Sequence, residues 1–225
     1  HKMIESVDVK SYQIRYRDFD IRRDIHTFVD YVSQRSVKRK THGNDLAKSD
    51  VKRLSKVLSY NHIMDEYEQW GWSSWVYFVD QLALSLEFTN YDIKGKYRGY
   101  SSSEPSFTNN YIEYKSEVYD LFLSLSLSEQ ENHLLRLLVT PYNHTNNEFF
   151  GLSPVGWLEH FPSWGSAVGT LPLINFAEVR DFLFYQLKDM ETGIWYSTAS
   201  WIQQLKKEYP YFLIPKESKR KKRGF

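Results

Sequence analysis

The sequence predicts a mainly α-helical protein with small β-hairpins. Apolar residues recur at helical spacing in several segments, and most of these segments begin at a Ser, Asp or Asn that can cap a helix. Two-residue alternation is confined to short stretches, as in hairpin strands. The 225 residues include 17 Tyr, 14 Phe and 7 Trp, a composition that excludes a disordered chain.

The first half of the chain predicts one strand and two helices. Tyr12 to Tyr16 alternates as a half-buried strand does, and Asp20 can accept the free amide protons of a following helix. A second helix is expected to begin at Ser49 or Asp50. The predicted apolar stripes are Ile21, Ile25, Phe28, Val29 and Val32 for the first helix, and Val51, Leu54, Val57 and Leu58 for the second.

A third helix and a hairpin are expected next. Residues 60–72 are interpreted as an acidic, aromatic connector, after which Ser73 or Ser74 caps a central helix over Trp75 to Leu86. Phe88 to Ile93 and Tyr111 to Tyr114 are typical of two strands, with a turn at residues 94–96. Three helices followed by a hairpin form a winged-helix pattern.

The second half predicts further helices around a connector. One helix is expected to begin at Ser116, with Val118, Leu121, Phe122 and Leu125 on its apolar face; others follow a capping box at Ser128 and Glu131, a second box at Asn175 and Glu178, and a cap at Ser197. Gly193, the short strand Ile194 to Tyr196, and a buried face of Trp201, Ile202 and Leu205 complete a second, incomplete unit. The resulting division is 1–139 winged-helix-like, 140–172 connector, 173–215 second winged-helix-like unit and 216–225 basic tail.

Two cationic segments stand out against a net charge of only +1. Residues 216–223 hold six basic residues and one acidic residue, and residues 35–56 hold eight basic and two acidic residues. Clustered Lys and Arg are typical of phosphate-binding surfaces. The predicted nucleic-acid contacts are Arg35, Lys38, Arg39, Lys40, Lys48, Lys52, Arg53 and Lys56, joined by Lys94, Lys96 and Arg98 of the hairpin.

These contacts favour the phosphate backbone over base edges. The third helix, which reads the major groove in many winged helices, has no Lys or Arg here and contains Asp80 and Glu87. We therefore expect sequence-independent binding by the loop, the second helix and the hairpin.

The segment His42 to Leu58, followed by Trp75 to Phe88, resembles the winged-helix module in the helicase-associated region of XPB-like bacterial and archaeal helicases. Gly193 to Leu205 resembles the opening of that region's next winged helix. The resemblance implies tandem winged-helix-like units in a non-catalytic accessory module that binds DNA and partners a helicase or another DNA-processing protein. The pair Gly95-Lys96 lacks the other residues of a phosphate-binding loop, so no helicase motor is indicated.

Two alternatives remain open at this point. Asp92, Glu113 and Lys115 have the residue types of a metal-dependent nuclease, in which two carboxylates hold Mg²⁺ and Lys polarises the attacking water. The many Trp and Tyr residues also suit a protein-interaction scaffold. The seven His form no close pair, so outside the nuclease alternative we expect no metal and no cofactor.

The chain has no Cys, which excludes disulfides, iron–sulfur clusters and thiolate nucleophiles and is typical of a reducing compartment. Its richest apolar run, Val118 to Leu127, is broken by Asp120 and two serines and is too short to cross a bilayer. We expect a cytoplasmic protein without a membrane partner.

Overall fold

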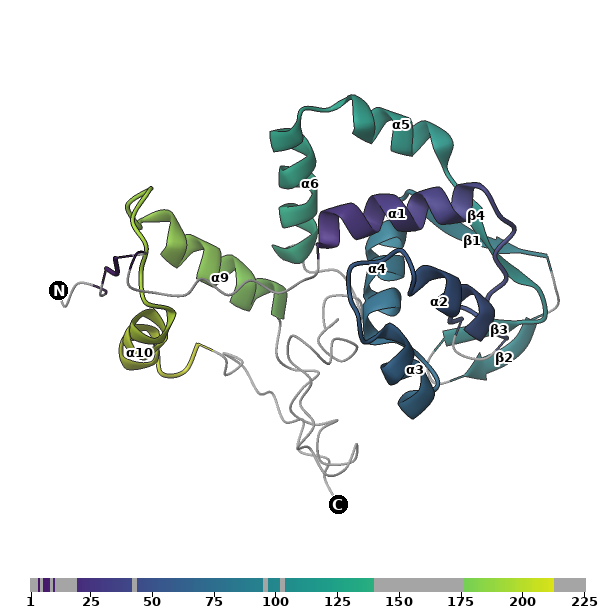
Figure 1. Cartoon of the computed structure of the whole chain (residues 1–225), viewed down its shortest axis with the longest axis horizontal. Helices are drawn as coiled ribbons and strands as arrows, with labels where there is room; N and C mark the ends of the chain where they lie inside the picture. Colours follow the sequence, from purple (N-terminus) through teal and green to yellow (C-terminus); the bar gives the residue numbers. More distant parts are fainter. Residues whose placement is uncertain are drawn as a thin grey trace, which may run out of the picture. The chain divides into compact units, whose positions relative to one another are not determined.

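The structure is a computed structural model that describes residues 4, 6–8, 10, 20–41, 44–94, 97–101, 104–139 and 176–212. It is mainly helical with small antiparallel sheets, so the predicted fold class is confirmed at that level (Figure 1). The chain divides into two compact units. The central unit comprises Asp18–Leu137 and Glu148–Trp157, and the terminal unit comprises His1–Arg17, Leu138–Asn147 and Leu158–Phe225.

Helix α1 (Ile21–Ser33) begins as the sequence predicts. The Asp20 carboxylate accepts hydrogen bonds from the backbone N–H groups of Arg22 and Arg23. The stripe of apolar residues then faces the core of the central unit, where Phe28 and Val29 are fully buried.

Helices α2 (Lys48–Leu54) and α3 (Ile63–Trp70) follow. No side chain caps α2, whose N-cap is Ala47, so the predicted cap at Ser49 or Asp50 is wrong. Its residues Val51 and Leu54 are buried, whereas Val57, beyond its end, is exposed. Helix α3 lies inside the segment interpreted as a connector, because Ile63 and Tyr67 bury one turn apart.

Helix α4 (Ser74–Ser85) is central, as predicted. The Ser73 hydroxyl accepts from the N–H of Val76 and caps it. Most of its residues are buried, including Trp75 and the charged Asp80. The helix is therefore a core element that packs against α1, and little of it remains to face a partner.

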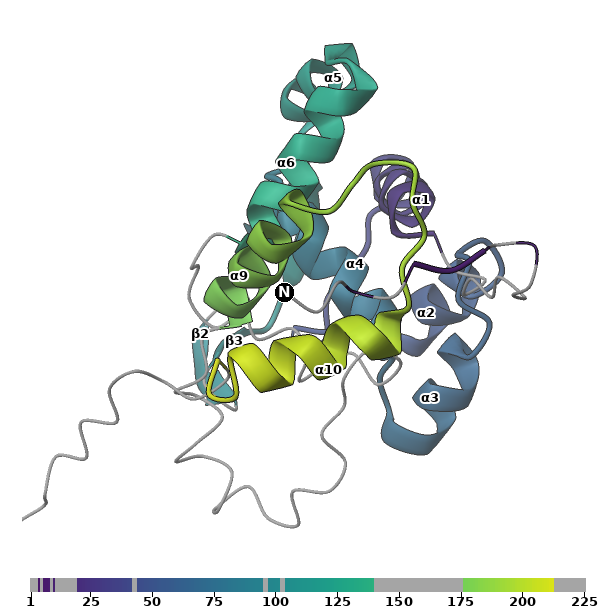
Figure 2. The same ribbon diagram turned by 90° about the vertical axis from the view of Figure 1, so that its left-hand side faces the viewer.

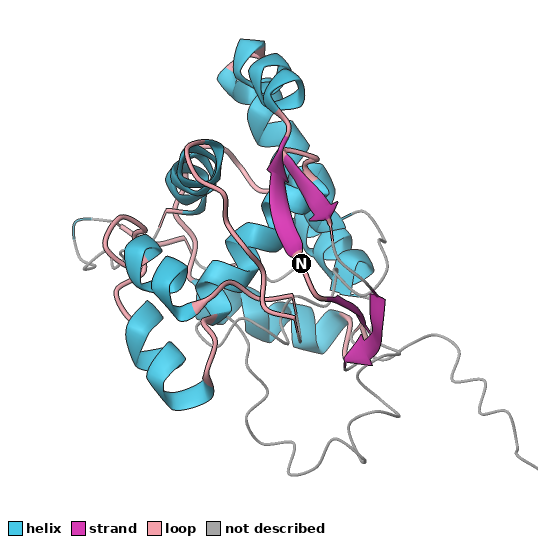
Figure 3. Cartoon of the chain, turned by 90° about the vertical axis from the view of Figure 1, so that its right-hand side faces the viewer, coloured by secondary structure: helices cyan, strands magenta, loops and turns pink. Residues whose placement is uncertain are grey.

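Strands β1 (Thr89–Ile93) and β4 (Asn110–Tyr114) pair antiparallel, which confirms the predicted hairpin and sets its register, with Asp92 opposite Tyr111 (Figure 3). The long connection carries a second pair, β2 (Tyr97–Ser101) with β3 (Glu104–Phe107). Residues 37–39 lie along the other edge of β4: Arg39 N–H donates to the Asn110 carbonyl and Ile112 N–H to the Val37 carbonyl.

Helices α5 (Ser116–Ser124) and α6 (Leu127–Val139) complete the described part of the central unit. Phe122 is buried as expected, but Leu121 is 70% exposed. The capping box that starts α6 lies two residues earlier than predicted: Ser126 N–H and hydroxyl donate to Glu129, and Glu129 N–H donates to the Ser126 hydroxyl. Ser128 and Glu131 have the same spacing but lie within the helix.

In the terminal unit, α9 (Phe176–Lys188) and α10 (Thr198–Glu208) are joined by a loop that contains Gly193 at φ 85° (Figure 2). Ser197 caps α10, as predicted, by accepting from the N–H of Ser200. Leu205 is buried, but Trp201 is only half-buried and Ile202 is 42% exposed, so the predicted burial of that face is correct for Leu205 alone.

The strand predicted over Ile194 to Tyr196 is reduced to one bridge, in which Tyr196 pairs with Ser6. Residues 1–17, interpreted above as part of the first domain, thus group with the C-terminal helices. The predicted strand Tyr12 to Tyr16, the cap Asn175, the connector 140–172 and the tail 216–225 lie outside the described residues. No helix in the described part of the chain combines the length and apolar composition needed to cross a bilayer.

Candidate nucleic-acid interface

The cationic segment, defined as residues 35–56, runs from the end of α1 to just beyond α2. Seven of its eight basic side chains reach the surface. Arg35, Lys38, Lys48, Lys52, Arg53 and Lys56 are exposed, and Lys40 is partly exposed.

Arg39 is the exception, because its side chain is 1% exposed. Its guanidinium forms two hydrogen bonds with the Asp80 carboxylate, at 2.6 and 2.8 Å, and donates a third to the Asn44 carbonyl. It also lies 4.7 Å from the centroid of the Tyr91 ring. Arg39 is therefore a core residue, and the expectation that it contacts phosphate is corrected.

Helix α2 presents cations on the face opposite its buried residues. Lys52 and Lys56 have no ion-pair partner among the residues described. Arg53 pairs with Asp50 at 3.3 Å, and Asp50 also accepts a hydrogen bond from the Tyr31 hydroxyl at 2.6 Å. One carboxylate is thus committed to α2, and two lysines beside it remain available to an anion.

The edge of the sheet adds two more lysines. Lys38 pairs with Tyr111 across the strands, and its ammonium group donates to the Asn109 side chain at 2.9 Å. Lys94 pairs with Asp92 at 2.8 Å and lies 5.5 Å from the Tyr111 ring centroid. The hydrogen bond with Asp92 raises the pKa of Lys94, so this lysine is charged at neutral pH.

The remaining predicted contacts cannot be added to this surface. Lys96 lies outside the described residues, and for Arg98 the structure describes only the backbone, within β2. The described interface therefore comprises the cations of α2 and its flanks, together with Lys38 and Lys94 at the sheet.

The proposed nuclease residues lie on one face of the hairpin but are engaged with lysines. Asp92 and Glu113 are diagonal neighbours in the register of β1 and β4. Asp92 pairs with Lys94, and Glu113 pairs with Lys115 at 2.8 Å. Among the residues described, no group of three or more His, Cys, Asp or Glu is placed to hold a metal ion. Ion pairing explains these residues without a metal.

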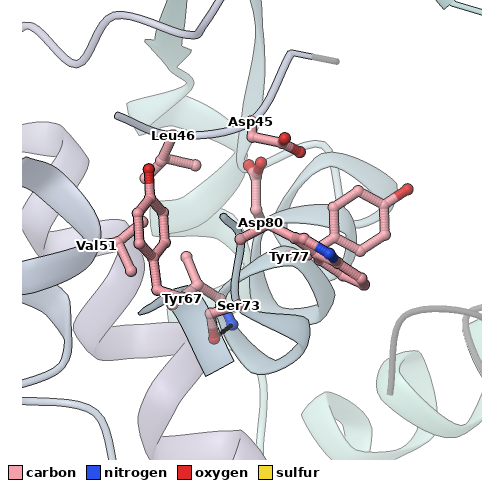
Figure 4. A pocket seen from close by; sticks show the side chains of 9 residues that line it. Asp45, Leu46, Val51, Tyr67, Ser73, Tyr77 and Asp80 are labelled. Atoms are coloured by element: carbon pink, nitrogen blue, oxygen red, sulfur yellow. Dashed lines mark hydrogen bonds between the residues drawn. The ribbon is translucent and has the colours of Figure 1, made fainter. Parts of the chain in front are cut away.

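A small pocket lies between α3 and α4, with Tyr67 on one wall, Tyr77 on the other and Asp80 between them (Figure 4). The rings of Trp72 and Tyr77 meet edge to face at 6.0 Å. The enclosed space is about that of one water molecule, so neither a base nor a sugar fits. Nucleic-acid contacts must be made on the surface around it.

Two tyrosines at this interface escaped the sequence analysis. Tyr111 lies beside Lys38 and Lys94, a placement that only the hairpin register reveals. Tyr67 lies beneath two lysines, at 5.0 and 5.8 Å from its centroid, and they come from segments at least 19 residues away. No spacing rule in the sequence signals that contact.

Comparisons of the chain with protein-family models, with curated proteins and with solved structures find no match.

Proposed function

We propose that the central unit is a non-catalytic nucleic-acid-binding module that contacts backbone phosphates. The observation that carries this proposal is the state of the cationic segment: of its seven surface cations, Arg53 alone forms an ion pair within the described chain. Cations without carboxylate partners keep their full attraction for phosphate and release counterions when it binds.

The order of elements supports a winged-helix-like arrangement of this unit. Helices precede a hairpin, and residues 37–39 add a short third strand beside β4. The burial of α4 and its lack of Lys and Arg favour phosphate contacts over base reading. We propose duplex DNA as the ligand and a helicase or another DNA-processing protein as the partner, with no cofactor. A second winged-helix-like unit formed by the C-terminal helices is part of the same proposal.

The test uses the full chain and a fluorescently labelled DNA duplex. Binding is measured by anisotropy over a series of salt concentrations for wild type and for the double variant Lys52→Ala, Lys56→Ala. If each lysine contacts one phosphate, the log–log salt slope falls by about 1.8, at about 0.9 per contact. Folding is preserved because both side chains are exposed.

The matched control is Lys206→Ala, Lys207→Ala, which removes two exposed lysines from the last turn of α10. This variant loses the same net charge at a place outside the proposed interface. Equal salt slopes for the two double variants, or no binding by wild type, would exclude phosphate recognition by α2.

Exposed leucines favour a second function, binding of a protein partner. Leu121 and Leu127 are 70% and 69% exposed, and Leu123 between them is 48% exposed. Large apolar side chains grouped on a surface are typical of interaction sites. We propose that these residues of α5 and α6 contact a protein partner, which cross-linking at cysteines introduced beside them detects if it is a second copy of the chain.

A further inference from the structure

Tyr67 brings together two lysines that are distant from it in the sequence. The ammonium nitrogen of Lys40 lies 5.0 Å from the centroid of the Tyr67 ring, and that of Lys48 lies 5.8 Å from the same centroid. Both distances are within the range of a cation–π interaction. The ring itself is 9% exposed and fixed in the core of the central unit, so it provides a rigid reference for two flexible side chains.

Lys40 is held by a second contact from the same helix. Its ammonium group donates to the carbonyl of Gly71 at 3.0 Å. Gly71 ends α3 in the left-handed conformation, with φ 76°, and its own N–H donates to the Tyr67 carbonyl. The carboxyl end of a helix carries partial negative charge, which favours a cation there. Two of the three donor positions on the Lys40 ammonium group remain available.

Neither lysine is neutralised by a carboxylate within the described chain. Two like charges held beside one ring repel each other, and an anion placed between or across them relieves that repulsion. The ring is uncharged and the pocket that it lines is too small for a ligand, so the available partner for these ammonium groups is an anion at the surface.

We propose that Tyr67 positions Lys40 and Lys48 as a clamp for the phosphodiester backbone of a nucleic acid. This inference rests on the proposed function and adds a positioning residue to it. A free lysine loses side-chain entropy when it binds, whereas a lysine already held against a ring has lost part of that entropy in the unbound protein. The clamp reads charge and spacing and no base.

The test compares Tyr67→Leu with Tyr67→Phe in the anisotropy assay described above. Phe keeps the aromatic face, so Tyr67→Phe binds as wild type does. Leu removes the face, and affinity falls about threefold to tenfold, from the loss of one or two surface cation–π contacts of about 0.5–1 kcal/mol each. Thermal unfolding of each variant identifies losses that come from unfolding.

The double variant Lys40→Ala, Lys48→Ala separates positioning from a merely structural role. In that background there are no lysines to position, so adding Tyr67→Leu has no further effect on binding. An equal loss with and without the lysines would overturn the proposal, as would wild-type affinity for Tyr67→Leu.

A comparison within α2 keeps the proposal testable if Tyr67→Leu does not fold. Lys48, held by the ring, loses more affinity on replacement with Ala than Lys52, which has no such contact in the described chain. An equal or smaller loss for Lys48→Ala excludes the clamp. Absence of duplex binding by wild type would instead reject the proposed function, so the two failures are distinguishable.

Discussion

Arg39 and Asp80 form a bidentate ion pair in the core of the central unit, with both side chains at most 2% exposed. The pair joins the segment that runs along β4 to the middle of α4. It also explains two features that look separate in the sequence, an arginine inside a cationic segment and an aspartate on an otherwise apolar helix. Each is present because the other is.

We predict that breaking this pair costs far more stability than replacing it. Asp80→Leu leaves the Arg39 charge buried and unpaired, which costs about 3–5 kcal/mol. The double variant Arg39→Met, Asp80→Leu removes both charges and recovers much of that loss. Urea unfolding of wild type, both single variants and the double variant measures the coupling between them, and purely additive losses would contradict the pairing.

A second prediction concerns the indole of Trp75. Its N–H donates to the buried Asp24 carboxylate at 2.7 Å, and Asp24 also accepts from the N–H and hydroxyl of Ser59. Trp75→Phe removes one hydrogen bond to a charged group, so the free energy of unfolding falls by about 2 kcal/mol or more. Trp70→Phe is the matched control, because Trp70 is 55% exposed and its replacement changes stability little. Equal effects of the two substitutions would show that the indole N–H contributes nothing.

A third prediction concerns pH. Burial lowers the pKa of His26, and the nearby charge of Arg22 lowers it further. The neutral ring is therefore favoured in the folded state, while the unfolded chain binds a proton near pH 6.5. Stability is present above about pH 6.5 and falls as the pH drops from there through the lower pKa of the folded state.

The variant His26→Gln isolates this contribution, because Gln does not titrate. Urea unfolding between pH 5 and 7.5, at about half-unit steps around the ordinary pKa of His, gives a shallower pH dependence for the variant than for wild type. Identical profiles for the two proteins would assign the acid sensitivity to other groups.

The fourth prediction replaces the expectation that Trp201 anchors the terminal unit. Leu205 is 5% exposed, so Leu205→Ala lowers the free energy of unfolding by about 2–3 kcal/mol through lost apolar burial and a cavity. Ile202→Ala, on the same helix but at 42% exposure, costs a fraction of that. Urea unfolding followed by tryptophan fluorescence distinguishes them, and a larger loss for Ile202→Ala would contradict the observed orientation of α10.

The features that could be predicted from the sequence are local ones. Asp20, Ser73 and Ser197 cap their helices because the amides that they accept lie two or three residues away. Even so, spacing alone did not distinguish the Ser126–Glu129 box from Ser128–Glu131. Two serines two residues apart, each followed by a glutamate at the same distance, offer the same local signal, and the path of the chain into α6 decides between them.

Features that depend on distant residues could not be predicted. Charge patterning assigned Arg39 to the surface, because nothing near it in the sequence reveals a partner 41 residues away. The same holds for Tyr67 beneath Lys40 and Lys48. The hairpin was predicted, but its register, and with it the place of Tyr111 between two lysines, follows from pairing across strands.

The bridge between Ser6 and Tyr196 has a consequence for synthesis on the ribosome. Residue 6 leaves the exit tunnel early, yet its partner is translated 190 positions later, after all of α1 to α6. The segment from Asp18 to Leu137 can begin to fold during translation, since most of its partners are within it. The terminal unit closes only when nearly the whole chain has been made, which makes its assembly the late step of folding and a natural point of control by chaperones.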